Sequence, residues 1–213
     1  MRGPQSESFL QGQLSQDLAT IDASGGWSLI LRPDGVVITS CFVRRDSDGF
    51  ELTLPRALAE IALARLRQFH LRVDCTMALS DALDGPFETT AELVEAGWPG
   101  VAELAAHLAP QSYGEAFVRT SVSFTKGCFT GQELVGRLDA RGSSVPWRLV
   151  RAKGPSAQVI DAALRSKGPA GPQGVTTAIS DDRGAIALGF VHRSLLDPVV
   201  RSGLVDVIIE ELA

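Results

Sequence analysis

The chain has 213 residues, of which 45% are hydrophobic and 21% are charged, and its formal net charge is −5. This composition is typical of a globular protein with enough apolar residues for one domain or two small ones. The negative charge disfavours direct nucleic-acid binding, which needs a basic face to displace counterions. Because we see neither an apolar run of roughly 20 residues nor a signal-peptide pattern, we expect a cytoplasmic protein with no membrane partner.

The three cysteines, Cys41, Cys75 and Cys128, are an odd number and have no C-x-x-C spacing. This pattern indicates neither a disulfide framework nor a zinc site, and reduced thiols are typical of the cytosol. The three histidines are scattered and do not pair at the spacing of metal ligands. We therefore predict no resident metal site.

The amino-terminal part of the chain predicts helices packed on a mainly antiparallel sheet. In chain order we expect a helix, three strands, a helix and a strand, over residues 8–20, 27–31, 36–44, 50–54, 57–69 and 71–78. The turn Arg-Pro-Asp-Gly joins the first two strands as a hairpin. The second helix has its apolar residues at helical spacing, so it can cover one face of the sheet.

The rest of the chain predicts two further helices and then a set of short strands. The helices cover residues 91–95 and 101–108, and the strands cover residues 147–152, 158–160, 175–180, 185–192 and 204–210. Short strands joined by glycine and proline turns are typical of a small barrel or sandwich.

The predicted fold class is therefore α+β, with an antiparallel sheet that carries helices on one face and a small C-terminal β-barrel. We place the α+β domain at residues 1–145 and the barrel at residues 146–213, with Pro146 at the boundary. A shortened sheet leaves an edge strand that needs cover. A homodimer is one way to cover it.

The most informative stretch is residues 126–133, which read Lys-Gly-Cys-Phe-Thr-Gly-Gln-Glu. It places an amine, a thiol, an amide and a carboxylate close together, with Gly127 and Gly131 between them. Glycine tolerates φ > 0 and lets another backbone or a ligand approach closely, so the two glycines predict a tight, shaped loop. The apolar residues that follow recur at helical spacing, which puts Glu133 in a first helical turn.

Cys128 is the candidate catalytic residue of this loop, together with Lys126. A thiol reacts as the thiolate, and a nearby cation or a helix N-terminus lowers a thiol pKa below its usual value of about 8.5. Lys126, two residues earlier, can supply the cation, and the next helix can supply the dipole. The alternative is that Cys128 is a small buried hydrophobic residue and Lys126 a solvated side chain.

The polar residues after the thiol are candidates for ligand binding. Glu133, with Gln132 beside it, can accept two parallel hydrogen bonds from the guanidine-like edge of a pterin or purine ring. Arg137 and Arg141 can hold a phosphate or the carboxylates of a glutamate tail. The alternatives are a pair that satisfies the free N–H groups of a helix start and two ordinary surface arginines.

Three segments together resemble the YgfZ family of folate-binding proteins, which is related to the T-protein (aminomethyltransferase) of the glycine cleavage system. Residues 123–135 resemble the family's diagnostic motif, roughly K-G-C-[FY]-x-G-Q-E, and the following Arg141-Gly142 fits the same pattern. Residues 9–17 resemble its amino-terminal FLQGQL-type segment. Residues 188–191 resemble its closing barrel strand.

The resemblance implies a shortened family member that binds tetrahydrofolate and supports the assembly or repair of iron–sulfur clusters in client enzymes. It also implies an indirect link to tRNA modification through those clients. The family's characteristic motif residues correspond here to Lys126, Cys128, Gln132 and Glu133. Two alternatives stay open, namely a folate-dependent one-carbon (aminomethyl) transferase and a non-catalytic scaffold that has lost the folate. We expect no classical aminomethyltransferase reaction, because this branch is not generally regarded as performing it.

Overall fold

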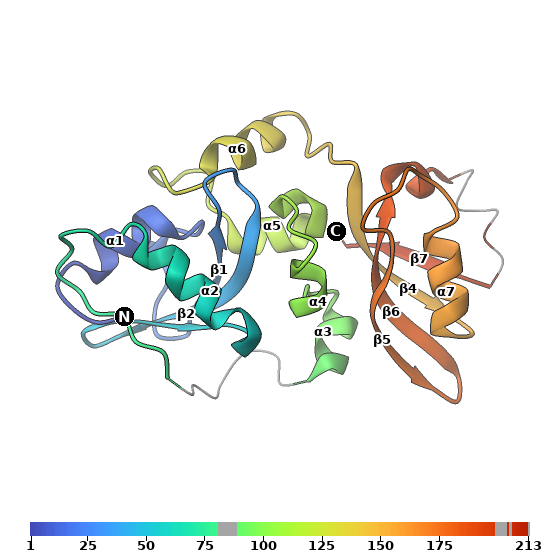
Figure 1. Ribbon diagram of the computed structural model, residues 1–213, viewed down its shortest axis with the longest axis horizontal. Coiled ribbons are helices and arrows are strands. Elements are labelled where there is room, and N and C mark those ends of the chain that lie inside the picture. The colour runs from blue at the N-terminus through green and yellow to red at the C-terminus, as the bar shows by residue number, and fades with distance from the viewer. Residues whose placement is uncertain (81–88, 199–203, 205, 213) are drawn as a thin grey trace. The chain divides into compact units, whose positions relative to one another are not determined.

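The computed structural model describes residues 1–80, 89–198, 204 and 206–212. The chain divides into two compact units, the first of Met1–Pro86 with Val118–Arg137 and the second of Phe87–Phe117 with Leu138–Ala213. Each unit contains one antiparallel sheet (Figure 1). The predicted domains, residues 1–145 and 146–213, stay a prediction.

The first unit is built on a three-stranded sheet. Its elements are α1 (Ser6–Gln13), η1 (Leu18–Thr20), β1 (Gly26–Leu31), β2 (Val37–Asp46), β3 (Gly49–Thr53) and α2 (Arg56–Arg67). The strands pair in the order β1-β2-β3, with Ile30 opposite Thr39 and Val43 opposite Leu52. The predicted hairpin is confirmed: Gly35, with φ 79°, lies in its turn and donates its N–H to the Arg32 carbonyl at 2.9 Å.

The core of this unit lies between α1, α2 and the sheet, where Leu10, Ile30 and Phe50 are almost fully buried. The helix predicted over residues 8–20 ends early, because Leu14 is extended and bridges to Ile30. The Asp17 side chain then accepts from the Ala19 N–H at 3.0 Å and caps the short η1 turn.

The strand predicted over residues 71–78 does not form. Only Thr76 pairs there, in an isolated bridge to Arg2. Arg72 has a positive φ of 57°, and the Cys75 N–H donates to the Val73 carbonyl at 3.0 Å in a tight local turn. These conformations are incompatible with an extended ladder.

The second unit is built on a four-stranded antiparallel sheet. Its elements are α3 (Thr90–Ala96), α4 (Val101–Leu104), η2 (Pro110–Tyr113), β4 (Trp147–Gly154), α7 (Ala157–Leu164), β5 (Gly174–Asp181), β6 (Gly184–His192), η3 (Arg193–Leu196) and β7 (Ile208–Glu211). Two more helices, α5 (Glu115–Ser121) and α6 (Gln132–Ala140), include the residues at which the chain passes from one unit to the other.

The strand order in this sheet is β5-β6-β4-β7. Lys153 of β4 lies opposite Ile186 of β6 on one side and Ile208 of β7 on the other. Among the described residues β5 and β7 do not pair, so the predicted barrel is not confirmed. β7 is an edge strand and exposes 63% of Ile208, so the expected cover by a second copy stays a prediction.

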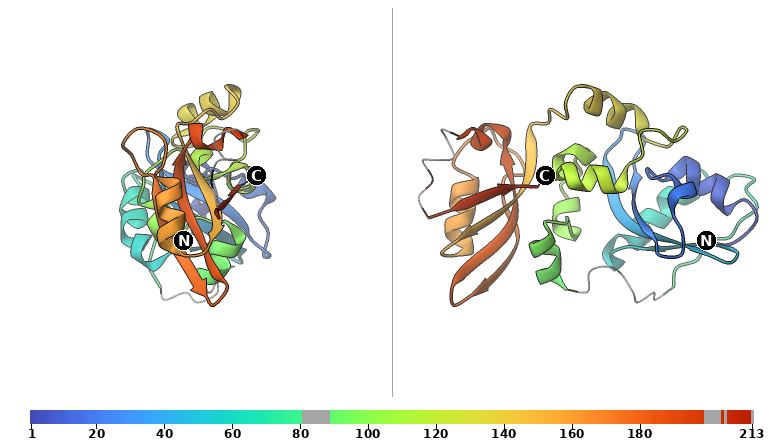
Figure 2. Two further views of the ribbon diagram at one scale, coloured as in Figure 1. Left: turned by 90° about the vertical axis from the view of Figure 1, so that its right-hand side faces the viewer. Right: turned by 180° about the vertical axis from the view of Figure 1, so that it is seen from behind.

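The strand predicted over residues 158–160 is instead part of the helix α7. The Ser156 hydroxyl accepts from the Val159 N–H at 3.3 Å and caps the helix start. Ile160 and Leu164 are fully buried and pack against the sheet. Figure 2 shows this helix in orange against the orange and red strands from two sides.

The opposite side of the second unit is organised by a buried carboxylate. The helix predicted over residues 101–108 ends at Leu104, and Glu103 in its last turn is 1% exposed. Glu103 accepts from the Gly100 N–H at 2.8 Å and from the hydroxyls of Thr176 and Thr177 at 2.5 and 2.6 Å. The two threonines lie at a register shift in β5, and such a bulge lets adjacent side chains reach one partner.

The mixed α/β class and the antiparallel pairing of both sheets are confirmed. Within the ranges described, none of the helices has the length and apolar character needed to cross a membrane.

Candidate functional site

The predicted site loop lies between α5 and α6 and is attached to the end of α1 and to the chain that follows it. The Ser123 N–H donates to the Ser15 carbonyl at 3.0 Å, and the Thr130 N–H donates to the Gly12 carbonyl at 3.0 Å. These two bonds hold the start and the end of the loop against residues 11–16. The motif and the FLQGQL-type segment, which are more than 100 residues apart in sequence, are therefore neighbours within the first unit.

Lys126 is the central link between these two segments. Its side chain is 8% exposed, and its Nζ donates to the carbonyls of Gln11, Leu14 and Gln16 at 2.7, 2.8 and 2.9 Å. The ammonium also lies 5.4 Å from the centre of the Phe129 ring, within the range of a cation–π contact. Burial lowers the pKa of Lys126 from 10.5 to about 8, and the Asp17 carboxylate partly opposes this change.

This arrangement limits what Lys126 can do for the thiol. An ammonium has three donors, and all three are used by backbone carbonyls. Lys126 therefore cannot also donate to the Cys128 sulfur without losing a bond. Cys128 itself is a free, exposed thiol, whereas Cys41 and Cys75 are buried. The alternative of Cys128 as a buried packing residue is thus excluded, and its reactivity stays a prediction.

The two glycines of the loop differ in what the fold demands of them. Gly131 has φ 85°, and a Cβ there would lie 2.7 Å from the Arg32 carbonyl oxygen, so this position requires glycine. At Gly127 a Cβ would meet nothing within 4 Å in the described structure, and φ is not in the left-handed region. The fold does not explain Gly127, which leaves room for a ligand to approach the backbone there.

Glu133 and Arg137 are brought together by α6. They form an i,i+4 ion pair, although the Glu133 side chain remains 85% exposed. Two groups predicted to bind a ligand thus bind each other in the free protein.

The other two predicted binding residues lie at the ends of α6. The Gln132 N–H donates to the Phe129 carbonyl at 3.2 Å, and its half-buried side-chain amide has no hydrogen-bond partner among the described residues. Arg141 belongs to the second unit, where it is exposed in the turn that ends α6 and donates its N–H to the Leu138 carbonyl at 3.2 Å.

Sequence reasoning missed the residues that support the loop from behind. The Gln13 Oε1 atom accepts from Arg65 Nη1 at 3.2 Å and from the Thr130 hydroxyl at 3.4 Å. Arg65 is 4% exposed, donates from Nε to the Leu31 carbonyl at 3.0 Å, and stacks 4.3 Å from the Phe69 ring centre. The available signal was an arginine three positions after Ala62, on the apolar face of α2.

The loop and the start of α6 present few polar groups. Within the described part of the chain, no three His, Cys, Asp or Glu side chains gather closely enough to hold a metal ion. The groups at the surface are one thiol and one carboxylate paired with a guanidinium, and beside them lies one half-buried amide without a partner among the described residues. Hydrogen bonding and thiol chemistry are what this arrangement offers.

No protein-family model matches the chain, and no curated protein matches it significantly. Among solved structures, the chain is similar to the crystal structure of glycine cleavage system aminomethyltransferase T from Bartonella henselae, with a TM-score of 0.61 and 16% identity. The similarity covers 91% of this chain and 75% of that one. Membership of the YgfZ family stays a prediction. The similarity shows that the chain shares the fold of a glycine cleavage aminomethyltransferase T protein.

Proposed function

We propose that this chain is a reduced-folate-binding accessory protein of the YgfZ type, which supports the assembly or repair of iron–sulfur clusters in client enzymes. Any link to tRNA modification is indirect and runs through those clients. The observation that carries the proposal is an exposed thiol, Cys128, on a loop whose backbone is anchored by the buried Lys126. The shared fold with an aminomethyltransferase T protein supports it.

Glu133 is the proposed acceptor for the pterin edge of tetrahydrofolate. A carboxylate takes two parallel N–H bonds from a guanidine-like edge, but here it must first release Arg137. An exposed ion pair of this kind contributes only about 0–1 kcal/mol, so the exchange costs little. The released Arg137 guanidinium is then available for the anionic tail, while Gln132 supplies an amide and Gly127 an open approach.

Cys128 is the proposed contact with the client enzyme. Because the sulfur is exposed, it can meet a client's iron or thiol directly. Thiolate is the form that binds metal and attacks disulfides, so the thiol proton leaves when iron binds. Lys126 acts on this chemistry by fixing the loop that presents Cys128.

Titration calorimetry with 5-formyltetrahydrofolate, a stable reduced folate, tests the binding step. We expect Glu133→Ala to weaken binding about tenfold or more, because it removes a charged acceptor worth roughly 1.5–3 kcal/mol. Asp139→Ala, which removes another exposed carboxylate of α6, is the matched control and should bind as the wild type does. Absence of binding heat for the wild type would favour the scaffold alternative.

Complementation tests the role of the thiol. In a strain that lacks its own YgfZ-type protein, Cys128→Ala should fail to restore iron–sulfur enzyme activity. Thr125→Ala, an exposed side chain of the same loop, is the control and should restore it. Circular dichroism should show the same fold for both variants. Full restoration by Cys128→Ala would contradict the proposed role.

A folate-dependent aminomethyl transferase is the second candidate, and the fold similarity favours it. It requires turnover of methylene-tetrahydrofolate by the purified protein in the presence of an amine acceptor. We expect no turnover, because the sequence offers no identifiable site for the substrate amine beside Glu133, the carboxylate nearest the thiol in sequence. Measurable turnover that is lost in Glu133→Gln would replace the accessory function with the transferase.

A further inference from the structure

The side-chain amide of Gln13 lies at the contact between α1 and the site loop. Its Oε1 atom accepts from the Thr130 hydroxyl at 3.4 Å and from Arg65 Nη1 at 3.2 Å. The adjacent Gly12 carbonyl accepts from the Thr130 N–H at 3.0 Å. The last two residues of α1 are thus bonded to the end of the loop, and Gln13 borders the proposed folate site.

The two contacts of Oε1 determine which way the amide of Gln13 faces. A guanidinium has only donors, so the amide atom that meets Arg65 must be the oxygen. The NH2 group therefore does not face Arg65, and it has no hydrogen-bond partner among the described residues. Gln13 is half-buried and its nitrogen is not enclosed, so two N–H donors remain open at the surface.

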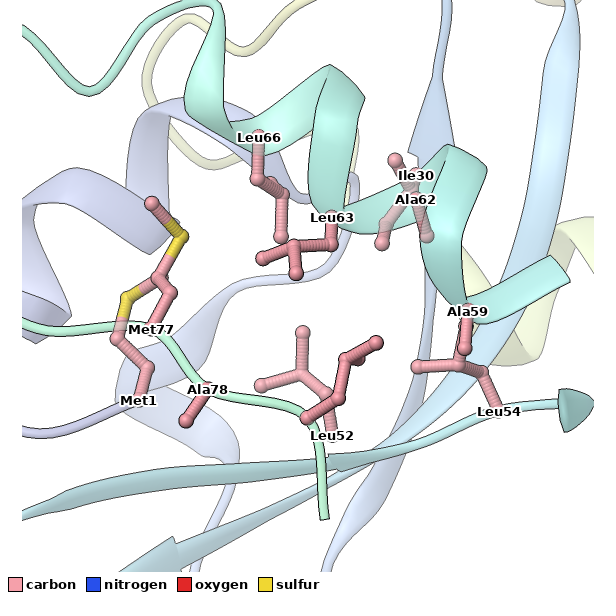
Figure 3. Close-up of a pocket in the computed structure, with 11 residues that line it drawn as sticks. Met1, Ile30, Leu52, Leu54, Ala59, Ala62, Leu63, Leu66, Met77 and Ala78 are labelled. Atoms are coloured by element: carbon pink, nitrogen blue, oxygen red, sulfur yellow. The ribbon is translucent and has the colours of Figure 1, made fainter.

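Arg65 is a buried cation without a counter-charge. It comes from α2, and Figure 3 shows that Ala62 and Leu66 point from this helix toward an apolar interior. Arg65 itself is 4% exposed, and its hydrogen bonds go to the Leu31 carbonyl and to Gln13. Its Nη2 atom is buried and has no partner in the described part of the chain. Burial lowers the pKa of Arg65, which shows how poorly its charge is compensated.

A glutamate at position 13 would serve this fold better than the glutamine does. Both partners of Oε1 are donors, so a carboxylate could accept from each of them. Charge-assisted hydrogen bonds are about twice as strong as neutral ones, and a carboxylate would also neutralise the buried guanidinium of Arg65. The contacts within the fold therefore do not explain the amide. What an amide has and a carboxylate lacks is an N–H donor.

We infer that Gln13 is a ligand-binding residue of the proposed folate site, where its NH2 group donates to an acceptor oxygen of the bound folate. Arg65 is its positioning residue, because it holds Oε1 and so leaves the donors open. This role rests on the proposed function and adds a donor to it. A folate carries both kinds of group, namely N–H donors on the edge assigned to Glu133, and carbonyl and carboxylate oxygens that need donors.

The isosteric variant Gln13→Glu separates a ligand role from a structural one, because it keeps both acceptor contacts and removes both donors. We expect its midpoint of denaturant unfolding to equal or exceed that of the wild type. Calorimetry with 5-formyltetrahydrofolate should show a loss of affinity of about tenfold or more. The loss should persist in about 0.5 M salt, which screens general repulsion between exposed charges.

Gln68→Glu is the matched control. It adds the same charge at an exposed position of the first unit and should bind the folate as the wild type does. Full affinity of Gln13→Glu would refute the ligand role and leave the proposed function standing, whereas absence of binding by the wild type would overturn both. A lower unfolding midpoint of Gln13→Glu would contradict the premise that the fold alone favours a carboxylate.

A double-mutant cycle tests the positioning role of Arg65. Arg65→Met should weaken folate binding where Gln13 is present and have no further effect in Gln13→Ala, because Arg65 acts through the amide. Equal losses in both backgrounds would show that Arg65 supports the fold as a whole, and would refute the positioning role. If Arg65→Met does not fold, Arg65→Lys replaces it in the same comparison, since lysine keeps the charge and loses the fork of donors.

Discussion

Each compact unit contains a buried charge that joins distant segments of the chain, and these two charges are of opposite sign. In the first unit the Lys126 ammonium binds three backbone carbonyls, and in the second the Glu103 carboxylate binds one N–H and two hydroxyls. Both charges make these contacts with uncharged groups, and both link segments that are far apart in sequence. The two sites differ in their partners. The Lys126 ammonium donates only to main-chain carbonyls, whereas two of the three groups that donate to Glu103 are threonine hydroxyls.

This comparison shows two ways to make a buried charge tolerable. A buried ion loses its hydration and needs several oriented dipoles in exchange. Carbonyls are present at every residue, so the site of Lys126 depends on the backbone path of residues 11–16. The site of Glu103 instead depends on the identities of Thr176 and Thr177. Substitution of Glu103 or of either threonine should therefore remove hydrogen bonds in the second unit. In the first unit, only substitution of Lys126 itself should remove them.

The largest effect is expected from Glu103→Ala. It leaves the Gly100 N–H and the hydroxyls of Thr176 and Thr177 without their acceptor, and bonds to a charged acceptor contribute about 1.5–3 kcal/mol each. We expect a net loss of about 4 kcal/mol in the stability of the second unit, less than the sum of the three bonds, because the substitution also removes the cost of burying a charge. Hydrogen exchange of α4 and β5 measures it. Glu95→Ala removes an exposed carboxylate of the same unit and should change stability by less than about 0.5 kcal/mol.

Lys126→Met is expected to act next most strongly, on the first unit. It keeps much of the side-chain volume but leaves three carbonyls unpaired, while it also removes the cost of burying a charge. The net loss should be about 3 kcal/mol. Denaturant unfolding followed by Trp27, with Trp98 and Trp147 replaced by Phe, reports on this unit. An unchanged denaturant midpoint would mean that the three bonds do not stabilise the first unit in solution.

A third comparison sets the two loop glycines against each other. Gly131→Ala should destabilise the first unit by about 2 kcal/mol, because φ is positive and a Cβ collides with the Arg32 carbonyl. Gly127→Ala should stay within about 0.5 kcal/mol of the wild type. If Gly127→Ala keeps its stability and loses folate affinity, the open space at Gly127 serves the ligand. Unchanged affinity would show that the approach lies elsewhere.

The smallest expected effect is a difference in pH dependence. Burial raises the pKa of Tyr113 from 10.0 to about 12, so the folded second unit keeps a proton that the unfolded chain releases above pH 10. The contribution of the protonated Tyr113 to the stability of the second unit is complete below pH 10 and is lost as the pH rises toward 12. Between pH 10 and 11 the second unit should lose about 1 kcal/mol. Unfolding followed by Trp98 and Trp147, with Trp27 replaced by Phe, measures this loss.

The first unit should respond in the opposite direction at lower pH. Because burial lowers the pKa of Lys126 from 10.5 to about 8, the unfolded chain holds more protons between these values and stability rises with pH there. From pH 8 to 9 the gain is about 1 kcal/mol or less. Burial raises the pKa of Cys41 from 9.0 to about 12, which opposes the gain above pH 9. A gain that persists in Lys126→Met would contradict this origin.

The parts of the fold that sequence predicts are those with local signals. The hairpin of β1 and β2 follows from a turn that contains Pro33, Asp34 and Gly35. The prediction of a strand at residues 158–160 was wrong. It rested on the β-branched residues Val159 and Ile160, but the Ser156 cap and the neighbouring alanines favour the helix α7 that forms there. The barrel was an inference from strand spacing, and spacing does not determine closure.

The candidate site shows a different limit. The sequence singles out the loop of residues 126–133, and it does so through side chains with distinct chemistry. It gives no indication that Lys126 faces inward, because its three hydrogen-bond acceptors are backbone carbonyls, and every residue type carries one. Glu103 was not singled out at all, since its partners are two ordinary threonines in a strand. Side chains that bind backbone or remote hydroxyls are therefore recognised only in three dimensions.

The contacts of Lys126 also bear on how the chain acquires its structure during synthesis. They join residues 110–115 positions apart, and the first unit is interrupted by residues 87–117 of the second. A ribosome must therefore release part of the second unit before the first can be completed. Closing so long a loop is entropically costly and slow compared with hairpin formation. The emerging amino-terminal sheet should accordingly spend this interval without the three bonds that Lys126 makes to residues 11–16.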